Sequence, residues 1–229
     1  MKHLKLGLFG LCAIVLCNAT GCTDNNSQPI DGTVFSTHYI QKYTQAQTLT
    51  IRTMPDEGCV QLLIDGNHIT HHDATAFRDL YTQYGDTDFN GYLVPYTMQA
   101  VATEFTAIDV TCDRAFDPAH PAGSSLADLV TLAGASAYPY LQSGYTASFD
   151  WRTAPADYRF EAEPVAHYGS GFSPVNNRLD ALSPDDLRLL DPTLYLRFKT
   201  SPAQTGTYLF TVTMTCAERT ISQTFPLTF

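Results

Sequence analysis

Apolar and polar residues alternate with a period of two over much of the chain beyond residue 33. Two alternating runs, Thr48–Arg52 and Cys59–Ile64, lie on either side of a turn-rich stretch at Met54–Gly58, which predicts a hairpin-like pair of strands. Four further runs with this period occur at 108–112, 194–199, 208–214 and 221–229. A period of two is typical of strands that bury one face, so the pattern predicts a mainly β fold.

Three short stretches have the features of helix starts instead. Apolar residues at helical spacing between Phe77 and Tyr84 predict a helix that Asp73 caps. Ser125–Asp128 resembles a capping box ahead of an apolar pair. Ser183–Asp186 combines a cap, a first-turn proline and acidic residues. We therefore expect a few short helices between the strands.

Near the C-terminus, Gly206–Phe210 resembles the penultimate strand of immunoglobulin-like sandwiches. In that family a tyrosine corner, here Tyr208, precedes an inward-facing residue, and this chain has Phe210 where true immunoglobulin domains have Cys. The resemblance implies an antiparallel β-sandwich with Ig-like C-terminal strands. The loop-rich stretch 133–178 is either a domain boundary or the long loops of one domain, and we interpret residues 34–229 as one domain.

The first residues form a different pattern. Lys2, His3 and Lys5 precede a 12-residue apolar run, Leu6–Cys17, which is too short to span a bilayer and is followed by small residues. This arrangement predicts a secretory signal peptide over residues 1–21. Residues 22–33 are mostly polar and are typical of a flexible tether, here leading to the β-rich domain.

The stretch Ala19–Cys22 resembles the lipobox of bacterial lipoproteins, with Ala19 at the position usually held by Leu. The resemblance implies that Cys22 receives a diacylglycerol and, after cleavage, an acylated amine. Three acyl chains exceed the two signals that stable anchoring requires. Thr23 in place of Asp implies delivery to the outer membrane, and Asp24 is a weak version of the acidic run that exports some lipoproteins to the cell surface.

A second resemblance covers Ile108–Val130, which is similar to stretches of small uncharacterised Bacteroidetes lipoproteins. It implies an extracytoplasmic β-rich domain and supplies no catalytic residues. The charge is compatible with such a location, because 23 acidic residues face only 13 lysines and arginines, for a net charge of −10. The absence of a basic stripe argues against nucleic acid and against electrostatic binding to anionic lipid.

Two stretches are candidate metal sites. His68–Asp73 contains three histidines and an aspartate, but it lacks the glutamate of the H-E-x-x-H motif, and a solvated loop ending in a helix cap also explains it. Asp86–Gly91 matches the first half of a calcium loop, but position 12 is Thr97 instead of a glutamate. Cys59, Cys112 and Cys216 have no C-x-x-C spacing and form at most one disulfide. We expect neither a metal nor another cofactor.

Candidate catalytic groups are few. Glu161 and Glu163 are spaced like the acid pair of a glycosidase if they lie on a strand, but two exposed glutamates have the same pattern. The sequence has no G-x-S-x-G, S-x-x-K or Walker motif. We therefore predict a protein that is not an enzyme.

The aromatic residues of one loop-rich segment are the candidate binding residues: Tyr138, Tyr140, Tyr145 and Trp151. They can form a platform for a glycan or a partner protein, or cover one end of the core. Between these, we expect Trp151 to be buried and Tyr138 and Tyr140 to be the exposed contacts.

The first hypothesis for function is therefore a lipid-anchored outer-membrane lipoprotein that binds a glycan or a protein without catalysis. A second hypothesis is a subunit of a fimbria-like assembly that polymerises by strand exchange through Thr220–Phe229. A third is a hydrolase that uses the histidine cluster or the glutamate pair.

Overall fold

The computed structural model describes residues 32–54, 59–95, 97–154 and 169–229. The predicted signal peptide, Cys22 and nearly all of the predicted tether lie outside the described residues, as does the pair formed by Glu161 and Glu163.

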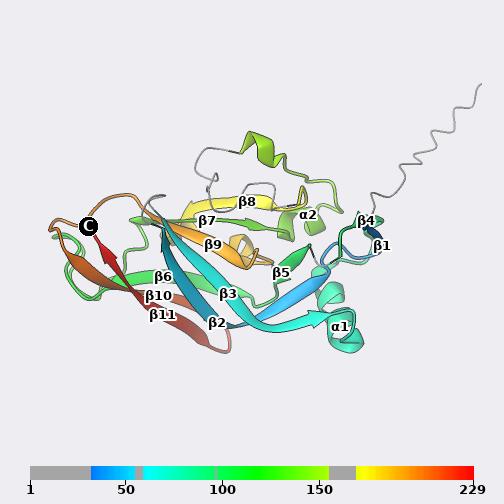
Figure 1. Ribbon diagram of the computed structural model, residues 1–229, viewed down its shortest axis with the longest axis horizontal. Helices are drawn as coiled ribbons and strands as arrows, with labels where there is room; N and C mark the ends of the chain where they lie inside the picture. Colours follow the sequence, from blue (N-terminus) through cyan, green and yellow to red (C-terminus); the bar gives the residue numbers. More distant parts are fainter. Residues whose placement is uncertain (1–31, 55–58, 96, 155–168) are drawn as a thin grey trace, which may run out of the picture.

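Two sheets and a short ribbon make up the β structure (Figure 1). The six-stranded sheet has the order β5 (Gln99–Val101), β2 (Lys42–Met54), β3 (Cys59–Thr70), β9 (Thr193–Phe198), β7 (Val130–Ser136), β8 (Ser173–Arg178). Its neighbours are antiparallel except β5 and β2. The three-stranded sheet has the order β11 (Thr220–Thr228), β10 (Thr207–Cys216), β6 (Phe105–Cys112), and the ribbon pairs β1 (Val34–Ser36) with β4 (Gly91–Leu93).

The two sheets bury a shared core, which makes the molecule a β-sandwich with a few short helices, as predicted. Leu62 and Leu196 from the six-stranded sheet belong to the same buried cluster as Val212 and Phe210 from β10. The side chain of Tyr208 donates a hydrogen bond of 2.8 Å to the carbonyl oxygen of Gln204. A tyrosine that bonds to the backbone a few residues upstream is the geometry of a tyrosine corner.

The opposite face of the six-stranded sheet is covered as well. Leu194 and Leu196 of β9 face the three-stranded sheet, whereas Tyr195 between them belongs to a second buried cluster. This cluster receives Phe77 from helix α1 (Ala74–Tyr84) and Leu141 from helix α2 (Tyr138–Gln142). The described residues also form three 3-10 helices: η2 (Trp151–Thr153), η5 (Leu179–Ala181) and η6 (Pro184–Leu187).

The predicted helices have three different outcomes. Helix α1 is confirmed, but the Asp73 carboxylate accepts a hydrogen bond from the backbone N–H of Thr70 and makes no capping bond to the helix. Ser183 begins η6 with a complete capping box. The helix expected after Ser125 is wrong: residues 127–129 form a turn, and strand β7 begins at Val130.

The predicted strands are confirmed, and β2 and β3 extend further than expected. The Asp65–Asn67 stretch, which resembles the end of a strand, lies inside β3 opposite a β-bulge between Ala46 and Thr48. A Cβ atom on Gly66 would collide with the backbone of Gln45 and Gln47. Glycine is therefore required by close backbone approach at the bulge, and it does not end the strand.

Candidate functional site

Exposed apolar side chains collect at one end of the molecule. Among the described residues, the exposed large hydrophobic side chains are Val34, Phe35, Tyr92, Val94 and Leu209. The first four lie on or directly after β1 and β4, and we call this part of the molecule the β1–β4 end (Figure 1). Phe35 and Tyr92 are register partners across the ribbon, with ring centroids 5.7 Å apart at 76°. Large exposed apolar groups in one place are typical of an interaction site.

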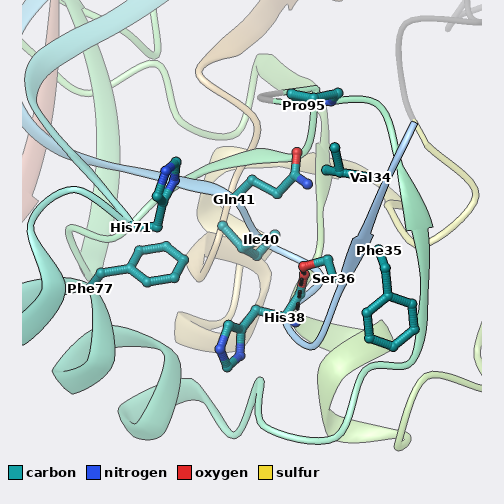
Figure 2. A pocket seen from close by; sticks show the side chains of 9 residues that line it. All are labelled: Val34, Phe35, Ser36, His38, Ile40, Gln41, His71, Phe77 and Pro95. Carbon is teal, nitrogen blue, oxygen red and sulfur yellow. Dashed lines mark hydrogen bonds between the residues drawn. The ribbon is translucent and has the colours of Figure 1, made fainter. Parts of the chain in front are cut away.

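A cavity of about 410 Å³ opens beside these side chains (Figure 2). It is lined by Val34, Phe35, Ser36, His38, Ile40, Gln41, His71, Phe77 and Pro95. The lining comes from β1, the segment that leads into β2, the turn before α1, α1 itself, and the segment after β4. Its volume is within the range of small-molecule sites, and its walls are mostly apolar.

The segment that forms the floor of the cavity is held by the carboxylate of Asp86. Helix α1 ends at Tyr84, and the left-handed conformation of the following Gly85 (φ 70°) turns the chain inward, so that Asp86 is fully buried. One carboxylate oxygen accepts from the backbone N–H of Tyr39 and the other from that of Ile40, both at 2.8 Å. The hydroxyl of Tyr145 donates a third hydrogen bond of 2.9 Å. Asp86 thus ties three distant segments together.

His38 is fixed from several sides. Its Nδ1 lies 2.7 Å from the backbone oxygen of Asp86, and because a carbonyl only accepts, Nδ1 carries the proton. The imidazole ring stacks on the ring of Tyr81 in α1, with 3.9 Å between the ring centroids. It meets the Phe77 ring edge-on, with 5.8 Å between the centroids. These contacts join the floor of the cavity to the helix that forms its wall.

The polar groups of the cavity differ in whether they have a hydrogen-bond partner. The hydroxyl of Ser36 donates to the backbone oxygen of His38 at 2.6 Å, a bond to the main chain instead of to an imidazole. The side-chain oxygen Oε1 of Gln41 is buried and has no hydrogen-bond partner among the described residues. A buried acceptor left unpaired is costly, so a ligand with an apolar body and one hydrogen-bond donor suits this site.

Burial also changes the ionisation of the groups around Asp86. Desolvation raises the pKa of the Asp86 carboxyl group, although the hydrogen bonds from Tyr39, Ile40 and Tyr145 oppose that shift. Desolvation likewise raises the pKa of the phenols of Tyr39 and Tyr145. These tyrosines are therefore neutral hydrogen-bonding groups at any physiological pH.

The half calcium loop at Asp86–Gly91 has a different role in the structure. The Asp86 carboxylate points inward, and both of its oxygens are occupied by protein donors. Asp88 is exposed and accepts from the hydroxyl of Thr87. Within the described ranges, no group of three or more histidine, cysteine, aspartate or glutamate side chains is placed to hold a metal ion.

The histidine cluster is divided between two elements. The interpretation of His68–Asp73 as one loop is wrong, because β3 continues to Thr70. His68 lies on this strand, with Nε2 3.1 Å from Asp65 and Nδ1 3.2 Å from the hydroxyl of Thr44. His71 instead lines the apolar cavity.

The aromatic candidates pack onto the second core. Trp151 is 6% exposed, as expected, and its indole N–H donates to the carbonyl of Phe172 at 3.0 Å. Its ring is therefore not open to a ligand in this conformation. Tyr140 and Tyr145 pack together with ring centroids 5.5 Å apart, and Tyr140 also packs on Tyr39.

Tyr138 and Tyr140 are both half-buried, so the expectation that these two are the exposed contacts is corrected. The guanidinium of Arg188 lies over the Tyr138 ring, 5.1 Å from its centroid, and donates to its hydroxyl at 2.8 Å. A binding role for Tyr138, Tyr140 and Tyr145 stays a prediction.

Sequence reasoning missed the β1–β4 end, because β1 and β4 are only three residues long and show no countable period. The available signal was the lack of charge: no charged residue occurs between Gly32 and Thr37 or between Phe89 and Thr103.

The three cysteines of the β-rich part, Cys59, Cys112 and Cys216, are all buried. Cys112 and Cys216 are free thiols. Among the described residues, no helix combines the length and apolar character needed to cross a bilayer. No family model, no curated protein and no solved structure matches this chain.

Proposed function

We propose that this chain is a lipid-anchored lipoprotein of the outer membrane that acts without catalysis, by binding an apolar group of a partner at the β1–β4 end. The observation that carries the proposal is the position of the exposed hydrophobic side chains. Val34, Phe35, Tyr92 and Val94 are between 47% and 55% exposed, and they lie beside an apolar cavity. The lipid anchor at Cys22 rests on the lipobox resemblance.

The lining of the cavity favours an apolar partner over a glycan. Sugar recognition depends on several polar groups around an aromatic ring. Here the Ser36 hydroxyl and Nδ1 of His38 instead form hydrogen bonds with backbone carbonyl oxygens. Gln41 is a polar group with unused hydrogen-bonding capacity at Oε1. One polar contact inside an apolar cavity orients a ligand and adds specificity.

The fimbria-like alternative receives less support from the fold. The segment Thr220–Phe229 corresponds to β11, which is an edge strand and so has the position that strand exchange needs. It already pairs with β10 from Thr220 to Thr228 and buries Ile221 and Phe225. Exchange would require the loss of all these contacts.

A neutral dye that fluoresces in apolar surroundings, such as Nile red, tests the binding site. We use the chain without residues 1–21, because every described element lies within residues 34–228. Phe35→Ser is expected to lower the fluorescence of the bound dye. Leu209→Ser is the matched control, since Leu209 is 45% exposed but lies on β10, outside the β1–β4 end. Equal dye fluorescence in the two variants would contradict the proposed site.

A further inference from the structure

We propose that the β1–β4 end rests on the lipid bilayer, with the rings of Phe35 and Tyr92 in the interfacial region. This inference rests on the proposed function, and it names the apolar partner of the β1–β4 end as the bilayer that holds the lipid anchor. Phe35 and Tyr92 are 55% and 54% exposed and form one aromatic pair on the ribbon. Aromatic side chains favour the level of the lipid headgroups, where an apolar ring and a polar edge are both accommodated.

The chemistry of this end allows it to approach lipid at little cost. No charged residue occurs in Gly32–Thr37 or Phe89–Thr103, the stretches that contain β1 and β4, so no charged side chain of these two stretches has to leave water on contact. The whole chain has a net charge of −10. This net charge and the absence of lysine and arginine from the two stretches argue against electrostatic attraction to anionic lipid as the driving force, so we expect an apolar contact.

The path of the chain selects the bilayer over other occupants of this surface. Strand β1 begins at Val34 and Cys22 precedes it closely, so that even a fully extended tether spans only about 40 Å. The acyl chains on Cys22 would thus hold the β1–β4 end near the membrane at a high effective concentration, which makes a weak apolar contact sufficient. The C-terminus and the three-stranded sheet lie toward the opposite end of the molecule (Figure 1).

The experiment uses the lipidated protein reconstituted in phosphatidylcholine vesicles, with Phe35→Trp and, as the matched control, Leu209→Trp. Both positions are exposed, and Trp151 contributes the same buried background to both variants. Vesicles that contain brominated phospholipid quench only indole rings that reach the bilayer. We expect a blue shift and strong quenching of the added emission in Phe35→Trp, and neither change in Leu209→Trp. Unchanged thermal unfolding of both variants checks that the fold is retained.

The outcomes separate this inference from the proposed function. Vesicle flotation reports the anchor by itself. If the Phe35→Trp protein floats with the vesicles while its added indole emission stays unquenched, the bilayer contact is overturned and the anchor remains intact. Protein that does not float would overturn both. If quenching is missing and sedimentation shows a dimer that Phe35→Ser dissociates, the surface belongs to a second copy of the chain and the bilayer contact is wrong.

Discussion

Asp86 is the residue on which the geometry of the candidate site depends. Its carboxylate accepts hydrogen bonds from two backbone N–H groups and from the hydroxyl of Tyr145, all in a buried place. An ionised carboxylate can accept hydrogen bonds at both of its oxygens at the same time. If a substitution replaces one of these oxygens by a donor, that donor faces a backbone N–H group, and the N–H group loses its hydrogen-bond acceptor.

Asp86→Asn is therefore expected to lower the free energy of unfolding by about 1–3 kcal/mol, because the new amide NH2 faces a backbone donor. Urea denaturation measures the change. Asp88→Asn is the control, since Asp88 is exposed and its carboxylate accepts from the neighbouring Thr87. We expect the control to remain within about 0.5 kcal/mol of the wild type. If the two substitutions lowered the free energy of unfolding equally, this result would contradict the structural role of Asp86.

The stability that Asp86 provides should also depend on pH. Burial raises its pKa above the ordinary value of 3.8, so over an interval above that value the unfolded chain is ionised while the folded chain still holds the proton. The unfolded state then binds fewer protons, and the free energy of unfolding falls as pH rises through this interval. The difference between wild type and Asp86→Asn, measured by urea denaturation, should be larger near the ordinary value than at neutral pH. A difference that grows toward neutral pH would show a lowered pKa instead.

Trp151 is a core residue in the structure, as its sequence context predicted. Trp151→Ala is expected to cost about 3–5 kcal/mol of the free energy of unfolding, through lost burial and the cavity left behind. Acrylamide should quench its fluorescence only weakly in the native protein. Strong quenching would show an exposed ring and return Trp151 to the binding candidates.

At the scale of elements, the sequence predicts those strands and helices whose two faces differ. Strand β10 alternates between buried and less buried residues, and α1 keeps Phe77 and Tyr84 on one face, so that both were predictable from periodicity. Strand β7 has no such alternation, because Leu132 faces the sandwich core while Ala133 and Ala135 face the second cluster. A strand buried on both faces carries no period to detect.

The candidate site was less predictable because its contacts are distant in sequence. The local sequence around Asp86 indicates a turn or half of a calcium loop, and nothing near it in the chain shows that its partners are Tyr39, Ile40 and Tyr145. The β-bulge opposite Gly66 is similar. A glycine between Asp and Asn indicates a turn unless the backbone of the neighbouring strand is known.

Gly66→Ala tests the bulge. The added Cβ would collide with backbone atoms of Gln45 and Gln47, which cannot move without distorting β2, so we expect a loss of about 1–3 kcal/mol in the free energy of unfolding. Asn67→Ala on the same strand, with an exposed side chain, serves as the comparison and should change stability by less than about 0.5 kcal/mol. Chemical denaturation of the two variants provides the measurement. A neutral Gly66→Ala would mean that the strands separate easily at this point.

At the scale of the whole molecule, we expect attachment to the membrane to depend on Cys22 alone. In Cys22→Ser cells, the cleaved protein is expected to move from the membrane fraction to the soluble fraction, because the acyl chains supply most of the binding and the apolar contact of Phe35 and Tyr92 is weak alone. Fractionation followed by immunodetection measures this. Cleaved protein that stays in the membrane fraction would show that another segment anchors the chain.

The tie made by Asp86 also has a consequence in time. Its partners Tyr39 and Ile40 lie 47 and 46 residues before it, and Tyr145 lies 59 residues after it. A chain is synthesised from its N-terminus, so residues 34–40 are present long before the groups that immobilise them. The surface that carries Phe35 is thus synthesised early but becomes ordered only after Tyr145 has been synthesised. A chain whose synthesis stops before Tyr145 would leave this surface open to proteolysis.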